Sequence, residues 1–217
     1  MLHLNISASS QTGLVREHNE DAVLVSHEIV RDMNLNTSAF LAPDGKYIVA
    51  VCDGMGGCNA GEVASKDAAE QLGRRVESLP AGLTMEGLRH LMDEWIQDEH
   101  AYLLYSGTED PETEGMGTTL VGMLYYEGHV CWLNCGDSRL YRLRRGILRQ
   151  VSTDHSLIRM THNSSDAHVI VNCLGAGADD VFLDFVDVTK EVKAGDIFLL
   201  CSDGLTDCSR TTKLRRC

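Results

Sequence analysis

Apolar runs rich in Val, Leu, Ile and Tyr recur along the chain and predict a β-rich protein. The dipeptides Glu127-Gly128 and Arg145-Gly146 stand between neighbouring runs, and both predict tight hairpin turns. The predicted strands are Ala22–Ser26, Tyr47–Cys52, Thr119–Tyr126, Val130–Cys135, Arg139–Leu143, Val181–Val188 and Ile197–Cys201. Strands joined by short turns favour antiparallel sheets.

Between residues 59 and 106 the apolar spacing becomes that of helices. Asn59, followed by Glu62 three residues later, is typical of a capping box that begins a helix. A second helix is predicted after Pro80, whereas residues 107–115 (GTEDPETEG) and 163–167 are polar and predict loops. The apolar stripes are Ala64, Ala68, Leu72 and Val76 in the first helix, and Leu88, Leu91, Met92, Trp95, Ile96 and Leu103 in the second.

The order of these elements is strands, two adjacent helices, then hairpin-linked strands. This order differs from the alternation of strands and helices that builds parallel sheets, and it predicts an α+β fold. We expect an antiparallel β-sandwich flanked by helices, in αββα layers. No Pro-, Gly- or Ser-rich stretch divides the 217 residues into two apolar halves, so a single domain is expected.

The charge balance restricts the partners of the chain. With 19 Lys and Arg against 32 Asp and Glu, its formal net charge is −13. Such an acidic surface disfavours sequence-independent binding to nucleic acid or to anionic membranes, so neither partner is expected. The first residues, MLHLNISASS, lack the basic and apolar segments of a signal peptide, and no apolar run is long enough to cross a membrane.

The eight cysteines do not form a zinc-binding pattern, because no pair has the C-x2-C spacing. Cys52, Cys131 and Cys201 lie inside apolar runs, where a reduced cysteine packs as a small hydrophobic side chain. We therefore expect a reducing, cytoplasmic location.

Three predicted strands each end in a small residue followed by an aspartate, at Asp53, Asp137 and Asp203, and a further acidic pair stands at Glu20-Asp21. An Asp-Gly after a single strand is most often only a turn. Three strand-end carboxylates on one sheet margin would repel one another unless cations lay between them. Oxygen ligands of this kind select Mg²⁺ or Mn²⁺, and a two-ion site activates water for attack on phosphorus. Arg16 is then a candidate for holding a phosphate.

Five motifs stand in the order found in a known family, the metal-dependent protein phosphatases of the type 2C serine/threonine class, which the chain resembles over residues ~10–207. They are Arg16-Glu-His-Asn-Glu20-Asp21-Ala, Val51-Cys-Asp53-Gly54-Met55-Gly56-Gly57, Gly115-Met-Gly117-Thr118-Thr119, Asn134-Cys-Gly136-Asp137-Ser138-Arg139 and Ser202-Asp203-Gly204-Leu205-Thr206-Asp207. The DGMGG form and the later Asp154-His155-Ser156 resemble the bacterial branch.

The resemblance implies a site for two Mn²⁺ or Mg²⁺ ions between two sheets, with a third, weaker ion possible. By position, Asp53 would bridge both ions, and the Gly54 carbonyl would bind one of them. Asp203 would bind the other ion, and Asp137 with Asp203 would form the weaker site.

The remaining implied roles concern water and substrate. Glu20 and Asp21 would act through metal-bound waters, and Arg16 would hold the substrate phosphate. A metal-bound hydroxide would hydrolyse phosphoserine and phosphothreonine in protein substrates, in opposition to a serine/threonine kinase. The alternative is a catalytically impaired or non-catalytic phosphatase-like module that binds a partner.

The chain departs from the family pattern in three places. Animal relatives place a histidine, a candidate general acid, where Met55 stands, and the segment after Ser156 is shorter than the bacterial flap. After a phosphatase-like domain at residues 1–207, residues 208–217 form a tail with four basic residues and no acid, where the family has a helix and a final Asp-Asn strand. With one carboxylate fewer, the first ion is expected to bind more weakly, so that activity needs more Mn²⁺.

Overall fold

The computed structural model describes the chain except residues 1, 15, 57–59, 158–160, 162–168 and 207–217. Within the described residues, eight strands form one large antiparallel sheet, with the central order β11-β6-β5-β7-β8-β12 and with β3 joined through β2 to β5. Its strands are β2 (Asp21–Val25), β3 (Glu28–Val30), β5 (Lys46–Met55), β6 (Gly117–Thr118), β7 (Leu120–Tyr126), β8 (His129–Cys135), β11 (Leu174–Gly175) and β12 (Asp184–Asp187).

Two smaller sheets accompany the large one in the part of the chain that the structure describes. One has the order β10-β9-β13, and the other pairs β1 with β4. Their strands are β1 (Leu2–Ser9), β4 (Asn34–Leu41), β9 (Arg139–Arg144), β10 (Ile147–Gln150) and β13 (Ile197–Cys201). The helices are α1 (Ala60–Ser78), α2 (Met85–Glu109), the 3₁₀ helix η1 (Pro111–Thr113) and the short α4 (Asp203–Thr206).

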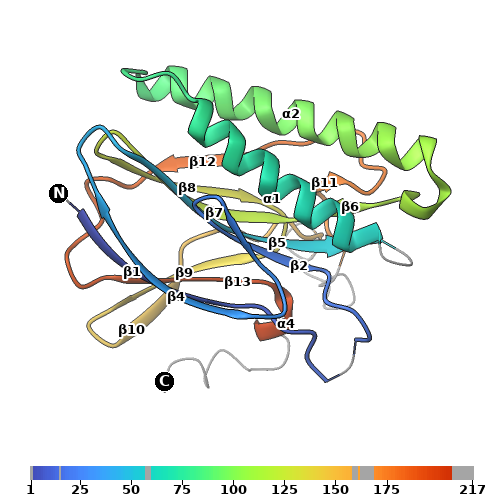
Figure 1. Ribbon diagram of the computed structural model, residues 1–217, viewed down its shortest axis with the longest axis horizontal. Coiled ribbons are helices and arrows are strands. Elements are labelled where there is room, and N and C mark those ends of the chain that lie inside the picture. The colour runs from blue at the N-terminus through green and yellow to red at the C-terminus, as the bar shows by residue number, and fades with distance from the viewer. Residues whose placement is uncertain (1, 15, 57–59, 158–160, 162–168, 207–217) are drawn as a thin grey trace.

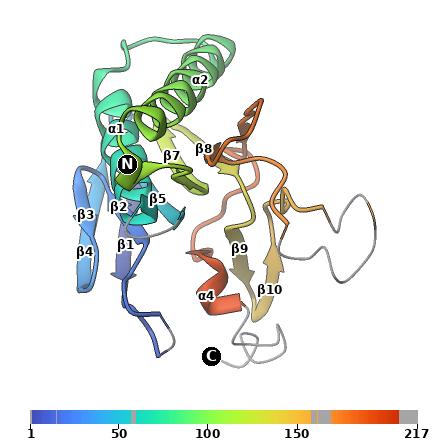
Figure 2. The ribbon, with the colours of Figure 1, turned by 90° about the vertical axis from the view of Figure 1, so that its right-hand side faces the viewer.

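The large sheet lies between a helical layer and the β10-β9-β13 sheet, as Figure 1 shows from top to bottom. Successive side chains of β5 point to opposite faces of the large sheet, so the strand contributes to the interface with the helices and to the interface with the smaller sheet. Ile48, Ala50 and Cys52 belong to the core that α1 and α2 cover, whereas Val51 packs in the second core with Trp132. In Figure 2 the two helices lie at the top of the view, and β9 and β10 lie at the lower right. This is the expected α+β fold of antiparallel sheets flanked by helices.

All seven predicted strands are present, with boundaries that differ by a few residues. The two predicted turns are confirmed by their left-handed backbone, since φ is 45° at Glu127 and 89° at Gly128, and 51° at Arg145 and 74° at Gly146. The pairing of β1 with β4 was not predicted, because these strands are rich in Ser, Asn and Thr and lack a continuous apolar run.

Both predicted helices are present, and the apolar stripe of each is buried except at the partly buried Leu91. The prediction of a loop over residues 107–115 is wrong in its first half, because α2 continues to Glu109 and η1 follows. Asp110 ends α2 by donating its backbone N–H to the Ser106 carbonyl, and its side chain caps η1 by accepting from the Glu112 N–H. The predicted cap at Asn59, the loop at 163–167 and the tail at 208–217 lie outside the described residues. None of the described helices has an apolar stretch long enough to cross a bilayer.

A buried carboxyl pair joins the two helices. Glu99 of α2 is 5% exposed, and its side chain lies against that of Asp67 on α1. Burial, followed by the negative charge of Asp67 and its hydrogen bond, raises the pKa of Glu99 to about 8. Glu99 therefore keeps its proton at neutral pH and shares it with Asp67.

This pair makes stability depend on pH in a defined direction. Between the ordinary pKa of 4.5 and about 8, the folded chain holds a proton on Glu99 that the unfolded chain releases. The free energy of unfolding must then fall as pH rises through this window, by up to about 1.4 kcal/mol per pH unit from this group. Glu99→Gln, which imitates the protonated form, should flatten that dependence in urea unfolding. Asp98→Asn, at an exposed neighbour on α2, should retain the wild-type slope. Equal slopes for the wild type and Glu99→Gln would contradict the assignment.

Candidate functional site

Two aspartates face each other across neighbouring strands of the large sheet. Asp21 begins β2, and the antiparallel register places it directly opposite Asp53 of β5. Like charges at opposed positions repel, so this pairing is unfavourable unless a proton or a cation lies between the two side chains. The first predicted strand, Ala22–Ser26, corresponds to β2, and β1 precedes it in the chain.

Two further aspartates complete the group, which we call the acid cluster: Asp21, Asp53, Asp137 and Asp203. Burial, followed by the charges of Asp21, Asp203 and Asp137, raises the pKa of Asp53 to about 9. Burial and the charge of Asp203 also raise the pKa of Asp137 to about 6. Four carboxylates from separate parts of the chain thus act on one another at one place.

The expected placement of these acids on one sheet margin is wrong in two respects. Asp53 lies on β5 of the large sheet, whereas Asp203 follows β13 of the smaller β10-β9-β13 sheet. Asp137 lies in the connection between β8 of the large sheet and β9 of the smaller one. Asp53 also does not end its strand, because β5 continues to Met55. The acid cluster therefore spans the space between two sheets, which the order of strands along the sequence does not reveal.

Hydroxyl groups hold the backbone around Asp53. The Thr118 hydroxyl donates to the Asp53 carbonyl over 3.0 Å, and the Asp53 N–H donates to the Thr119 hydroxyl over 3.2 Å. The same Thr119 hydroxyl lies 2.7 Å from that of Ser138, the residue after Asp137. The Gly115–Thr119 motif thereby ties the two acid-bearing segments together.

Gly54 lies where no side chain fits. Its N–H donates to the Glu20 carbonyl over 3.1 Å, and a Cβ at this position would stand 2.1 Å from the Gly61 carbonyl oxygen and 2.6 Å from that of Glu20. The backbone of β5 thus touches both the Glu20 segment and the first turn of α1. This close approach fixes the three segments relative to one another.

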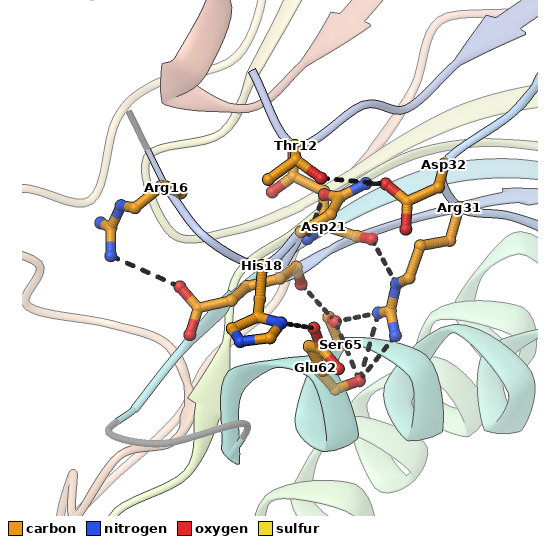
Figure 3. Close-up of polar contacts among 10 residues, drawn as sticks. Thr12, Arg16, His18, Asp21, Arg31, Asp32, Glu62 and Ser65 are labelled. Carbon is orange, nitrogen blue, oxygen red and sulfur yellow. Dashed lines mark hydrogen bonds and ion pairs between the residues drawn. The ribbon is translucent and has the colours of Figure 1, made fainter. Parts of the chain in front are cut away.

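Arg31 was not predicted as a site residue, although it organises the Glu20-Asp21 segment (Figure 3). Its guanidinium donates to the Asp21 carbonyl over 2.8 Å, to the Glu62 carbonyl over 3.1 Å and to the Ser65 hydroxyl over 2.7 Å. The buried Ser65 hydroxyl in turn donates to the Glu20 carbonyl over 2.5 Å. The acceptors of these hydrogen bonds are mainly backbone carbonyls that are distant in the sequence, so no local sequence motif predicts them.

Arg16 extends into solvent and pairs with Glu20 (Figure 3). Its side chain is 77% exposed, and one guanidinium nitrogen lies 3.6 Å from a carboxylate oxygen of Glu20. An ion pair this exposed contributes little to stability. The guanidinium therefore remains available to an incoming anion.

His155 supports the loop that carries Asp137. Its Nδ1 accepts the Gly136 N–H over 3.1 Å, and its Nε2 lies 3.1 Å from a carboxylate oxygen of Asp184. Asp184 thereby favours the proton on Nε2, which leaves Nδ1 as the acceptor. Asn172 adds a contact of 2.8 Å to the same Nδ1. The Asp-His-Ser motif was noted as a family feature, but this role in positioning was not predicted.

The donor set fits hard divalent cations. The acid cluster supplies only oxygen ligands, and burial with mutual repulsion raises the pKa of Asp53 and of Asp137, as expected where a positive charge would favour ionisation. Among the described residues, no three His, Cys, Asp or Glu side chains converge closely enough to hold an ion by themselves. Carbonyl oxygens such as that of Gly54, together with waters, must then complete any coordination shell.

Residues 31–216 match a family described as protein phosphatase 2C. The chain is 32% identical over 213 residues to the serine/threonine phosphatase stp of Listeria monocytogenes, which covers 93% of this chain and 78% of the relative. It is 30% identical to the serine/threonine protein phosphatase PstP of Mycobacterium tuberculosis, covering 95% of this chain and 37% of PstP. It is also 28% identical to the protein phosphatase PhpP of Streptococcus pneumoniae, covering 98% of this chain and 83% of PhpP.

Solved structures show the same fold. The M. tuberculosis PstP structure superposes with a TM-score of 0.71 at 27% identity and covers 99% of this chain and 84% of that one. A structure of the PstP catalytic domain in complex with two manganese ions superposes with a TM-score of 0.71 at 28% identity, covering 98% of this chain and 83% of that one.

Proposed function

This chain belongs to the protein phosphatase 2C family, in its bacterial-type branch, and on that premise we propose how its residues hydrolyse phosphoserine and phosphothreonine. The enzyme class is serine/threonine protein phosphatase, as the named relatives indicate. The observation that carries the proposed mechanism is the acid cluster, four aspartates gathered between two sheets, three of them partly buried, whose like charges favour bound cations.

Two Mn²⁺ or Mg²⁺ ions are the proposed cofactors, supported by the two manganese ions in the PstP structure. Asp53 would bridge both ions, with the Gly54 carbonyl on one and Asp203 on the other; Asp137 with Asp203 would hold a third. Bound divalent cations lower the pKa of water and neutralise charge on a phosphoryl group.

The surrounding residues orient the reactants. Glu20 and Asp21 are proposed to accept hydrogen bonds from water in the site, and Arg31 and Ser65 fix their backbone for this purpose. Met55 cannot donate a proton to the leaving serine or threonine oxygen, and a water molecule is proposed to supply it.

Arg16 is proposed to bind the substrate phosphate. Arg16→Ala should raise KM for a phosphothreonine peptide about tenfold, because it removes one charge-assisted hydrogen bond, and should leave kcat and Mn²⁺ binding nearly unchanged. Steady-state kinetics and calorimetry check this result. Arg74 is a matched control, because it is 69% exposed and lies 3.6 Å from Glu70 in a comparable ion pair. An equal KM for Arg16→Ala and Arg74→Ala would remove Arg16 from phosphate binding.

The direct test of function uses a phosphothreonine peptide with the full chain. Release of phosphate should require Mn²⁺, stop on addition of EDTA and return when Mn²⁺ is restored. Mn²⁺ binding without any turnover would contradict the mechanism and favour a non-catalytic binding module.

The proposed partners are phosphorylated proteins and the serine/threonine kinase that modifies them. A cytoplasmic location is proposed as well. Its support is that the five described cysteines, Cys52, Cys131, Cys135, Cys173 and Cys201, are buried free thiols, as expected where thiols stay reduced.

A further inference from the structure

The hairpin of β9 and β10 gathers four arginines around one cavity in a chain whose formal net charge is −13. The cavity has a volume of about 220 Å³ and is lined by Arg142, Arg144, Arg145, Ile147 and Arg149. We call it the arginine cavity. Its volume is about seven times the roughly 30 Å³ that one water molecule occupies in the liquid, so it admits an anion larger than water.

The pairing of the hairpin brings like charges together. Arg142 lies directly opposite Arg149, and Arg144 lies opposite the exposed Ile147. Alternation places these four side chains on one face of the hairpin, while Leu143 and Leu148 occupy the other. Directly opposed like charges destabilise a sheet, so an anion between them would relieve a cost that is built into the fold.

Two of the arginines have protein partners, and two do not. Arg144 forms a double hydrogen bond with Asp196, at 2.6 and 2.5 Å, and Arg142 lies 3.8 Å from Glu191. Within the described residues, no hydrogen bond or ion pair involves the side chain of Arg145 or Arg149. The cavity thus contains two guanidinium groups whose donors are free for a ligand.

The chemistry of these donors selects a phosphate group. A carboxylate offers two oxygens, whereas a phosphate dianion offers three or more and satisfies several guanidinium forks together. An extended nucleic acid is disfavoured, because the acidic surface beyond the hairpin repels it.

The cavity is separate from the acid cluster. The lining residues of the cavity begin at Arg142, three residues along β9 from Arg139, and reach the turn at Arg145, which at about 3.3 Å per residue is a separation of roughly 10 to 20 Å. Figure 1 shows this turn at the opposite end of the β10-β9-β13 sheet from α4, which begins at Asp203. A phosphate bound at the hairpin would therefore not be the one hydrolysed.

We propose that the arginine cavity binds a phosphate monoester or orthophosphate anion as a second, non-catalytic phosphate site. The source of the phosphate is either a second phosphorylated residue of a protein substrate or free phosphate. The first source rests on the proposed phosphatase function, whereas anion binding itself does not.

Isothermal titration calorimetry tests binding: orthophosphate is titrated into the full chain in the presence of EDTA, and the heat of binding is measured. Without metal, the acid cluster repels anions, so saturable binding must occur elsewhere. Arg149→Gln and Arg145→Gln should each weaken binding about tenfold, while the control Arg74→Gln should bind as the wild type does. Absence of saturable binding, or equal loss in Arg74→Gln, would overturn the proposal.

The source is distinguished with the Mn²⁺-loaded enzyme. Two peptides are compared, each with one phosphothreonine. Six residues from it, one peptide carries phosphoserine and the other carries glutamate. A lower KM for the phosphoserine peptide that disappears in Arg149→Gln identifies the substrate as the source. Equal KM values, with orthophosphate binding intact, identify free phosphate. Hydrolysis of a small aryl phosphate should be unchanged in Arg149→Gln, so a failure of this site is separable from a failure of the phosphatase function.

Discussion

Asp53→Asn is expected to abolish Mn²⁺ binding and to lower kcat/KM by at least about 10³-fold, a loss of roughly 4 kcal/mol of transition-state stabilisation. The substitution keeps the shape of the side chain and removes the carboxylate proposed to bridge both ions. Calorimetry and phosphopeptide kinetics measure the two effects. Asp44→Asn, at an exposed position before β5, is the control and should bind and turn over as the wild type does.

The same variant should become more stable in EDTA. At neutral pH, Asp53 must be protonated on folding because burial and neighbouring charges raise its pKa to about 9, whereas asparagine needs no proton. A gain of about 1–3 kcal/mol in the free energy of unfolding is expected for the metal-free variant. Loss of activity with a gain in stability separates a ligand role from misfolding. Wild-type turnover by Asp53→Asn would refute the metal assignment.

Gly54→Ala is expected to destabilise the fold by about 3 kcal/mol or more, because the added Cβ meets backbone atoms that cannot rotate away. The nearest atom, the Gly61 carbonyl oxygen, is 2.1 Å from the ideal Cβ position. Relief requires α1 to move off β5, so activity should fall as well. Urea unfolding and phosphopeptide kinetics measure both.

Gly87→Ala provides the contrast within the first turn of α2. Its Cβ would make ordinary contacts with the Thr84 hydroxyl at 3.4 Å and a Leu83 methyl group at 3.8 Å, and alanine in a helix should gain roughly 0.5–1 kcal/mol. If Gly54→Ala unfolds at the same urea concentration as the wild type, α1 is free to shift, and the contact does not fix the site.

The sequence predicted those parts of the fold whose signal is local. The strands around Val51 and Val121 and the buried stripes of α1 and α2 have regular apolar spacing, and the structure confirms them. The pairing of β1 with β4 was missed, because its residues are largely polar and its stability comes from a partner about thirty residues away in the chain.

The residues of the candidate site also fall into two groups, those predicted from the local sequence and those that were missed. Asp53, Asp137 and Asp203 were identified from strand-end patterns, and the structure brings them together, although their roles as ligands stay a prediction. Arg31 and Ser65 were missed, because their partners are backbone carbonyls that approach only when α1 packs on β2 and β5. Long-range contacts of this kind depend on tertiary packing and leave no mark on the local sequence.

The division of the acid cluster between two sheets has a consequence for folding. Asp53 lies on the large sheet, Asp203 follows a strand of the smaller one, and Asp137 lies in the connection between them, so the cluster exists only while the sheets are docked. The two sheets are held together by the apolar layer that includes Trp132 and Leu140. The backbone hydrogen bonds within each sheet do not depend on this layer. We therefore expect catalytic competence to be acquired late during folding. On warming, turnover should be lost before the far-ultraviolet circular dichroism changes.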